Sequence, residues 1–130
     1  MNNPPPRIVV TGRIPESGVE LLRAAGDVWN WTSDDPIPAD VRDAQLGHAD
    51  AVVTLLSDRV DDQFLAAAPR LGIVANVAVG YNNIDVEACT ARGVRVTNTP
   101  GVLTDATADL AMGLLLAVTR RLGEGERLIR

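Results

Sequence analysis

A glycine that follows an apolar segment offers the clearest chemistry in this sequence. Gly80 comes shortly after residues 71–77, which have the continuous apolar pattern of a buried strand. Glycine lets the backbone turn sharply and approach a ligand closely, which leaves amide N–H groups available to a carboxylate. The alternative is that Gly80 only ends a strand. From residue spacing, both interpretations stand.

Other residues of chemically useful types are predicted to have structural roles. His48, the only histidine, lies at a helix-to-strand junction without a partner and is interpreted as a surface residue. Cys89 is predicted to be packed and unreactive, because no nearby cation would activate a thiolate. The carboxylate pairs are interpreted as helix-start and solvated residues and not as ligands: Asp61 with Asp62, and Asp105 with Asp109. No His/Cys cluster indicates a metal site.

The elements that would position Gly80 alternate between strand and helix. Strands are predicted at residues 8–10, 28–31, 51–56, 71–77 and 94–97, with helices between Pro15 and Gly26 and at residues 39–46, 61–68 and 86–91. Apolar strands interleaved with helices are typical of a parallel sheet covered on both faces. The predicted fold class is α/β, a flavodoxin-like doubly wound parallel sheet of five strands in the order 2-1-3-4-5. Ligands bind such sheets outside the carboxyl ends of the strands, where Gly80 is expected.

The last predicted helix, residues 104–122, has a different character. Thr104 is a good N-cap, and nearly every position from Ala106 to Val118 is apolar or small. A helix that is apolar on most sides requires neighbours on most sides. It is expected either to fold back over the sheet or to pair with the same helix of a second chain, leaving some apolar surface for dimerisation.

Three stretches carry a resemblance to a known family. They are Asn-Val-Ala-Val-Gly-Tyr-Asn-Asn-Ile-Asp and its continuation within residues 76–121, Trp-Thr-Ser-Asp-Asp-Pro-Ile-Pro at 31–38, and Leu-Leu-Ser-Asp at 55–58. The sequence resembles the D-2-hydroxyacid dehydrogenase family, in the branch of glyoxylate/hydroxypyruvate reductases. The resemblance implies hydride transfer from NAD(P)H to a small 2-keto acid. Within the family, D-3-phosphoglycerate dehydrogenase is an alternative, and a stand-alone flavodoxin-like structural or oligomerisation module is another.

The resemblance also implies site residues. In that family the backbone of the pair equivalent to Val79 and Gly80 holds the substrate carboxylate, and Leu56 lines the same pocket. Thr107 would lie against the cofactor. The catalytic Arg, Glu and His of the family, and its Gly-x-Gly-x-x-Gly nucleotide fingerprint, are expected beyond Arg130. Gly123-Glu124-Gly125 does not replace the fingerprint, because it follows a helix and lacks the third glycine.

These expectations divide the chain into residues 1–100, a substrate-binding domain, and residues 101–130, an interdomain and dimerisation helix, with the Rossmann domain absent. A 130-residue polypeptide of this kind is expected to be inactive alone, as a truncated or isolated domain. NADP or NAD would serve the complete protein, and none is expected on this chain. A small 2-keto or 2-hydroxy acid would bind weakly, and a homodimer would form through helix 104–122.

Bulk composition excludes several other classes of function. The net charge is −5, which argues against nucleic acid or an anionic membrane as partner. Apolar residues make up 46% of the chain, which favours a compact core over disorder. The single cysteine and the absence of a signal-like start predict a cytoplasmic protein.

Overall fold

The computed structural model describes residues 4–130, and the chain divides into two compact units. One unit is Met1–Thr99 and the other is Pro100–Arg130. Each unit has its own secondary structure and is described separately below.

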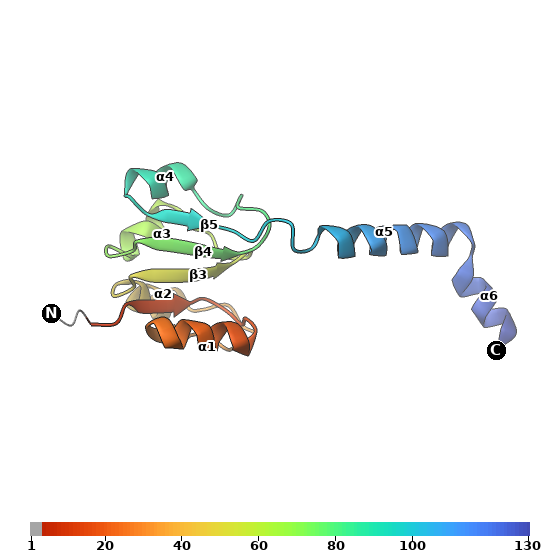
Figure 1. Ribbon diagram of the computed structural model, residues 1–130, viewed down its shortest axis with the longest axis horizontal. Helices are drawn as coiled ribbons and strands as arrows, with labels where there is room; N and C mark the ends of the chain where they lie inside the picture. Colours follow the sequence, from red (N-terminus) through yellow and green to blue (C-terminus); the bar gives the residue numbers. More distant parts are fainter. Residues whose placement is uncertain (1–3) are drawn as a thin grey trace. The chain divides into compact units, whose positions relative to one another are not determined.

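The first unit contains a five-stranded sheet in which all strand pairs are parallel, in the order β2-β1-β3-β4-β5 (Figure 1). This confirms the predicted fold class and strand order. The strands are β1 Arg7–Val10, β2 Asp27–Asn30, β3 Ala51–Leu55, β4 Ile73–Val77 and β5 Arg95–Thr97. The helices are α1 Glu16–Ala25, α2 Ala39–Leu46, α3 Asp62–Ala67 and α4 Val86–Ala91.

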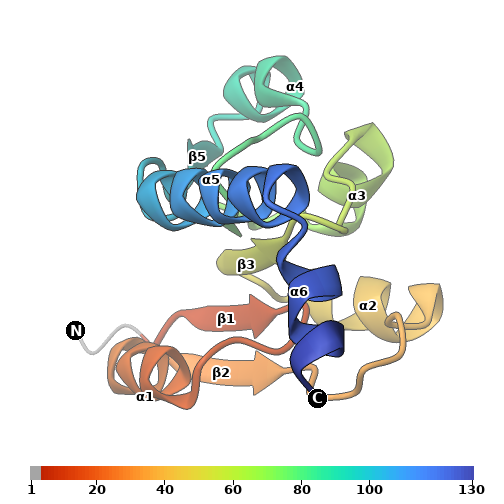
Figure 2. The ribbon, with the colours of Figure 1, turned by 90° about the vertical axis from the view of Figure 1, so that its right-hand side faces the viewer.

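The sheet buries apolar residues on both faces, because successive side chains of a strand point to opposite sides. Val9, Val52 and Val74 pack on one face with side chains from α2, α3 and α4. On the other face, Val10 and Val53 form a smaller cluster against which Leu22 of α1 packs. Figures 1 and 2 show α1 on one side of the sheet and α2 and α3 on the other. Both faces carry helices, as predicted, but unequally.

Side-chain caps define the start of two short helices next to the carboxyl edge of the sheet. Asp61 accepts hydrogen bonds from the N–H groups of Gln63 and Phe64, which confirms its interpretation as a helix-start residue. These N–H groups, chiefly that of Phe64, hold the pKa of Asp61 below its ordinary value. Asp85 caps α4 in the same way. Behind that cap Cys89 is buried, and burial is the main cause that raises the pKa of its thiol.

The second unit consists of α5 Thr104–Thr119 and α6 Leu122–Ile129, which contact each other (Figure 2). The predicted helix 104–122 therefore ends at Thr119, and α6 was not predicted. Arg121 adopts a left-handed conformation with φ of 53°, which separates the two helices. Neither helix contains a buried residue, and no helix within residues 4–130 is long and apolar enough to cross a bilayer.

A carboxylate at the amino edge of the sheet makes the stability of the first unit sensitive to acid. Asp50 accepts hydrogen bonds from the backbone N–H of Arg7 at 2.8 Å and from the guanidinium of Arg70 at 2.7 Å. These contacts, the Arg7 N–H first, lower the pKa of Asp50 below its ordinary value. A lowered folded-state pKa stabilises the fold above the unfolded-state pKa, and this contribution is lost as the pH falls through the folded-state pKa.

We expect Asp50→Asn to lower the free energy of unfolding at pH 7 by about 1 kcal/mol, because the charge-assisted bonds weaken. The difference from wild type should shrink as the pH falls below the ordinary Asp pKa of 3.8. Urea unfolding at pH 7 and pH 3 measures both values. Asp62→Asn is the control, because its exposed pair with Arg92 should contribute little. A pH-independent difference at Asp50 would contradict the assignment.

Candidate functional site

The predicted ligand residues of the first unit come from two neighbouring loops at the carboxyl edge of the sheet. Leu56 directly follows β3, whereas Val79 and Gly80 follow β4. The two strands pair in parallel, with Leu55 opposite Val77, so both loops emerge at the same edge. Leu56 is 63% exposed and Val79 is 42% exposed. The structure therefore places these three residues on neighbouring, solvent-accessible loops.

The loop of Val79 and Gly80 is held through its carbonyl oxygens. The side-chain amide of Asn98 donates to the Val79 carbonyl at 2.7 Å, and that of Asn76 donates to the Gly80 carbonyl at 3.0 Å. Within residues 4–130, the N–H groups of Val79 and Gly80 donate to no other group of the protein. The loop thus offers two free backbone donors on a fixed backbone, an arrangement suited to an anion.

Neither the backbone conformation nor the packing at position 80 requires a glycine. Its φ lies outside the left-handed region, and a Cβ built there would meet no protein atom within 4 Å. The space beside Gly80 is therefore open. A glycine in such a place keeps room for something other than the protein itself.

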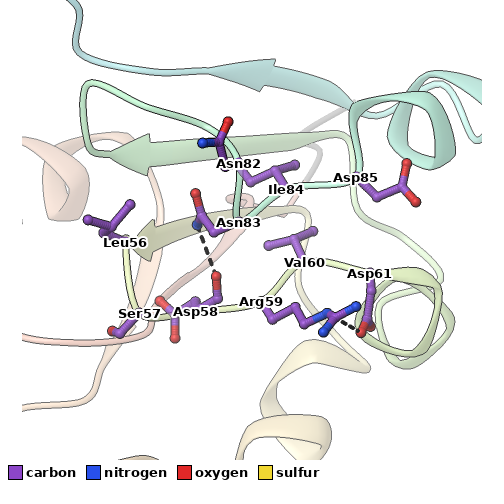
Figure 3. A pocket seen from close by; sticks show the side chains of 10 residues that line it. All are labelled: Leu56, Ser57, Asp58, Arg59, Val60, Asp61, Asn82, Asn83, Ile84 and Asp85. Atoms are coloured by element: carbon purple, nitrogen blue, oxygen red, sulfur yellow. Dashed lines mark hydrogen bonds and ion pairs between the residues drawn. The ribbon is translucent and has the colours of Figure 1, made fainter.

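The loop of Leu56 is held by the carboxylate of Asp58. This carboxylate accepts from the Leu55 N–H at 2.6 Å and from the hydroxyl of Thr11, at the end of β1. Beside this loop lies a cavity of about 560 Å³, lined by residues 56–61 and 82–85 (Figure 3). Leu56 borders the cavity, whereas Val79 and Gly80 lie outside its lining.

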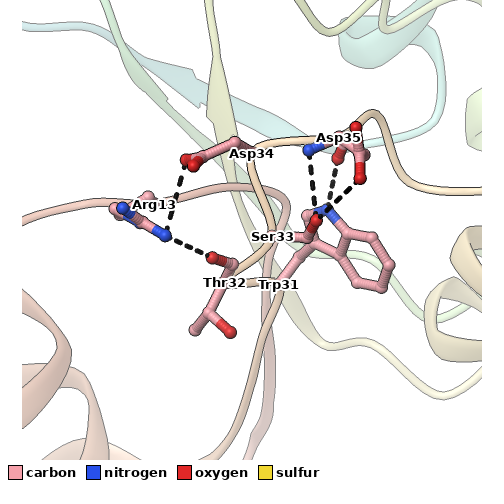
Figure 4. Close-up of polar contacts among 6 residues, drawn as sticks. All are labelled: Arg13, Trp31, Thr32, Ser33, Asp34 and Asp35. Atoms are coloured by element: carbon pink, nitrogen blue, oxygen red, sulfur yellow. Dashed lines mark hydrogen bonds and ion pairs between the residues drawn. The ribbon is translucent and has the colours of Figure 1, made fainter.

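The Trp31 motif forms a compact loop on the other side of residues 56–59. The indole N–H of Trp31 donates to the Asp35 carbonyl at 2.7 Å, and Arg13 donates to the Thr32 carbonyl at 2.8 Å (Figure 4). A second cavity, of about 640 Å³, is lined by residues of this loop and by Leu55 and residues 57–59. Residues 31–38 therefore form one wall of the space beside the Leu56 loop. The groups in these two hydrogen bonds are used within the protein.

The remaining predicted residues belong to other elements. Thr107 is in the first turns of α5, in the other unit, and its hydroxyl donates to the Leu103 carbonyl at 2.7 Å. His48 is exposed between α2 and β3, at the amino edge of the sheet. Gly123-Glu124-Gly125 lies within α6 and not after a strand. Residues 4–130 contain no cluster of His, Cys, Asp and Glu that could hold a metal ion.

Sequence analysis missed the polar side chains beneath the loops. Thr54 and Asn76 are 0% and 2% exposed, and Asn83 is half-buried beside them. The available signal was an Asn within the apolar strand Ile-Val-Ala-Asn-Val. A buried amide is costly unless it is hydrogen-bonded, so it indicates a partner nearby.

Comparisons with known proteins all point in one direction. The sequence profile of the D-isomer specific 2-hydroxyacid dehydrogenase catalytic domain matches residues 8–122. A glyoxylate reductase of Thermococcus kodakarensis is 52% identical over 125 residues, which cover 96% of this chain and 38% of that protein. The chain thus spans less than half the length of this relative.

Solved structures give the same result. A 2-hydroxyacid dehydrogenase from Ketogulonicigenium vulgare superimposes with a TM-score of 0.81 at 32% identity, over 98% of this chain and 40% of that one. An NADPH-dependent glyoxylate/hydroxypyruvate reductase from Sinorhizobium meliloti, in complex with NADP and malonate, has a TM-score of 0.71 at 36% identity, over 97% and 38% of the respective chains.

Proposed function

Because the chain belongs to the D-isomer specific 2-hydroxyacid dehydrogenase family, we propose that it supplies the substrate-binding part of a glyoxylate/hydroxypyruvate reductase. In the complete enzyme, a hydride passes from a nicotinamide cofactor to the keto carbon of a small 2-keto acid. The names of the T. kodakarensis and S. meliloti relatives support glyoxylate or hydroxypyruvate as the substrate.

The observation that carries this proposal is the pair of free backbone donors at Val79 and Gly80. A 2-keto acid presents a carboxylate, which these N–H groups can bind beside the open space at Gly80. Leu56, on the neighbouring loop, is proposed to line the same pocket. Together they contribute binding free energy that holds the substrate in the site before the reaction.

The cofactor is proposed to be NADPH or NADH, bound when the complete enzyme is assembled, and it supplies the hydride. The S. meliloti relative is NADPH-dependent by its name, which supports NADPH. Thr107, near the start of α5, is the residue of this chain proposed to contact it. The proton and the grip on the keto oxygen are assigned to an Arg and a His–Glu pair outside the 130 residues. A reducing, cytoplasmic location is consistent with the unpaired Cys89.

Assembly as a homodimer is proposed through α5. Its large apolar side chains are more than half exposed, namely Leu110, Met112, Leu114, Leu115, Leu116 and Val118. A continuous apolar surface of this kind is typical of protein–protein contacts. Pairing with the same helix of a second chain would remove it from water.

Titration of the 130-residue chain with glyoxylate or oxalate tests the site. We expect a dissociation constant that is millimolar or weaker, equivalent to a binding free energy of about −4 kcal/mol or less favourable, because two N–H donors act without a cationic partner. Amide shifts should centre on Val79, Gly80 and Leu56. Gly80→Ala should weaken these shifts without loss of stability, because its methyl group enters the open space and meets no protein atom.

Gly47→Ala is the matched control for that titration. Gly47 has right-handed helical φ and lies at the amino edge of the sheet, and an added Cβ there meets only ordinary contacts. It should bind like wild type. Micromolar saturation, or shifts confined to another surface, would show that the carboxylate site has been misplaced.

A further inference from the structure

Two buried polar side chains lie side by side in the centre of the sheet. Thr54 of β3 is opposite Asn76 of β4, and its hydroxyl donates to the Asn76 Oδ1 at 3.0 Å. Both are at most 2% exposed. An amide in an apolar strand costs free energy unless all its bonds are made. The groups to which Asn76 donates therefore indicate what it holds in place.

The side-chain amide of Asn76 donates two hydrogen bonds at the carboxyl edge of the sheet. Its Nδ2 lies 3.0 Å from the Gly80 carbonyl oxygen and 3.1 Å from the Asn83 Oδ1. The Asn83 Nδ2 in turn lies 3.3 Å from the Asn76 Oδ1, so the two side-chain amides are joined by reciprocal N–H···O contacts. The two hydrogens of the Asn76 amide are thus both used, one on each partner.

Asn83 continues the network into the second loop. Its Nδ2 donates to the Asp58 carbonyl at 2.9 Å (Figure 3). The same Nδ2 lies 3.3 Å from the Leu55 carbonyl. These two carbonyls flank Leu56. One amide therefore joins the loop that carries Gly80 to the loop that carries Leu56.

Backbone hydrogen bonds support the same connection. Val60 and Ile84 form an isolated parallel bridge, in which the Val60 N–H donates to the Asn83 carbonyl at 2.9 Å and the Asp85 N–H donates to the Val60 carbonyl at 2.8 Å. The two loops are therefore fixed to each other by main chain on one side and by Asn83 on the other.

We propose that Asn83, oriented by Asn76 and Thr54, is a positioning residue that sets Leu56 against the Val79–Gly80 backbone donors. It acts through the two loops and does not touch the substrate. The proposal rests on the proposed function, because it assigns Asn83 a part in holding the carboxylate site. A merely structural Asn83 would instead affect the stability of the fold and leave substrate binding by folded molecules unchanged.

The test uses a fusion of residues 1–130 to the part of the T. kodakarensis glyoxylate reductase that this chain does not match. In Asn83→Asp, a carboxylate oxygen replaces the donor and faces the carbonyl oxygens of Leu55 and Asp58. We expect the KM for glyoxylate to rise about tenfold or more, with kcat and the KM for the nicotinamide cofactor changed by no more than about twofold, because lost ground-state positioning appears in KM. Thr54→Val is isosteric and should also raise the KM for glyoxylate, by a smaller factor than Asn83→Asp.

Gln45→Glu is the matched amide-to-acid control. It keeps the oxygen to which Arg7 donates, at the amino edge of the sheet, and should leave the KM for glyoxylate unchanged. An unchanged KM in a folded Asn83→Asp variant, or a fall in kcat alone, would overturn the proposal. If Asp at position 83 prevents folding, Thr54→Val decides: a raised KM supports positioning, and a wild-type KM overturns it.

Failure of the proposed function has a different signature: the wild-type fusion folds but does not turn over glyoxylate. In that case the connection between the two loops is tested by measuring backbone amide chemical shifts of the 130-residue chain. Asn83→Asp should shift resonances in both residues 55–58 and residues 78–80. Shifts restricted to residues 81–85 would overturn the connection itself.

Discussion

Fusing residues 1–130 to the unmatched part of the T. kodakarensis glyoxylate reductase is expected to give an enzyme that oxidises NADPH or NADH with glyoxylate. The 130 residues alone are expected to be inactive. The 52% identity over 125 residues supports correct assembly of the two parts. The 130 residues alone have one histidine, His48, at the amino edge of the sheet and so remote from Gly80. A missing general acid alone lowers rates by about 10²–10⁴-fold.

Absorbance at 340 nm measures the rate, with the unmatched part alone as a control for residual activity. The T. kodakarensis enzyme itself is the positive control. Turnover by the 130-residue chain above a blank would refute the proposed division of labour. A folded, inactive fusion would refute the proposed function.

Leu115→Glu is expected to dissociate the proposed homodimer. Leu115 lies in the middle of α5 and is 55% exposed. In a symmetric pair of helices the substitution acts twice, and burial of each Leu contributes about 1.5–3 kcal/mol. The dissociation constant should therefore rise by at least about 100-fold. Sedimentation velocity over a range of concentrations measures it.

Leu21→Glu is the matched control for the dimer. It makes the same substitution at an exposed leucine of α1, 75% exposed, which is not part of the proposed α5 interface. It should perturb association less than Leu115→Glu. A monomeric wild-type chain, or a Leu115→Glu variant with unchanged association and stability, would show that this side of α5 is not an interface.

The fold could be predicted from the sequence because its signals are local and repeated. Strands β1, β3 and β4 are mostly apolar, and Gly or Pro lies near many of the helix ends. The strands therefore follow from local composition, and their order follows from the usual parallel arrangement. The unequal cover of the two faces by helices was not predictable from periodicity, because a strand that is buried on both faces carries apolar residues on both and so does not mark one face.

The candidate site was only partly predictable. Gly80 is visible because glycine after a strand is a local signal, and Leu56 and Val79 came from family resemblance. Asn83 was missed because its partners, Asn76 and the Asp58 carbonyl, come from two different loops and strands. Helix α6 was missed because Gly123 and Gly125 lower helix propensity by about 1 kcal/mol each.

Because Cys89 is buried, its reaction with a thiol reagent reports on local unfolding of the first unit. The chain has one cysteine, in the helix that begins right after the Asn83–Asp85 loop. A thiol reagent can reach it only in molecules whose α4 has transiently detached from the sheet, so the alkylation rate follows the population of that open state. A carboxylate that binds the Val79 and Gly80 N–H groups in the folded state, and not in the open state, lowers this population. Occupancy of the site is therefore readable as slower labelling of a thiol that the ligand never contacts.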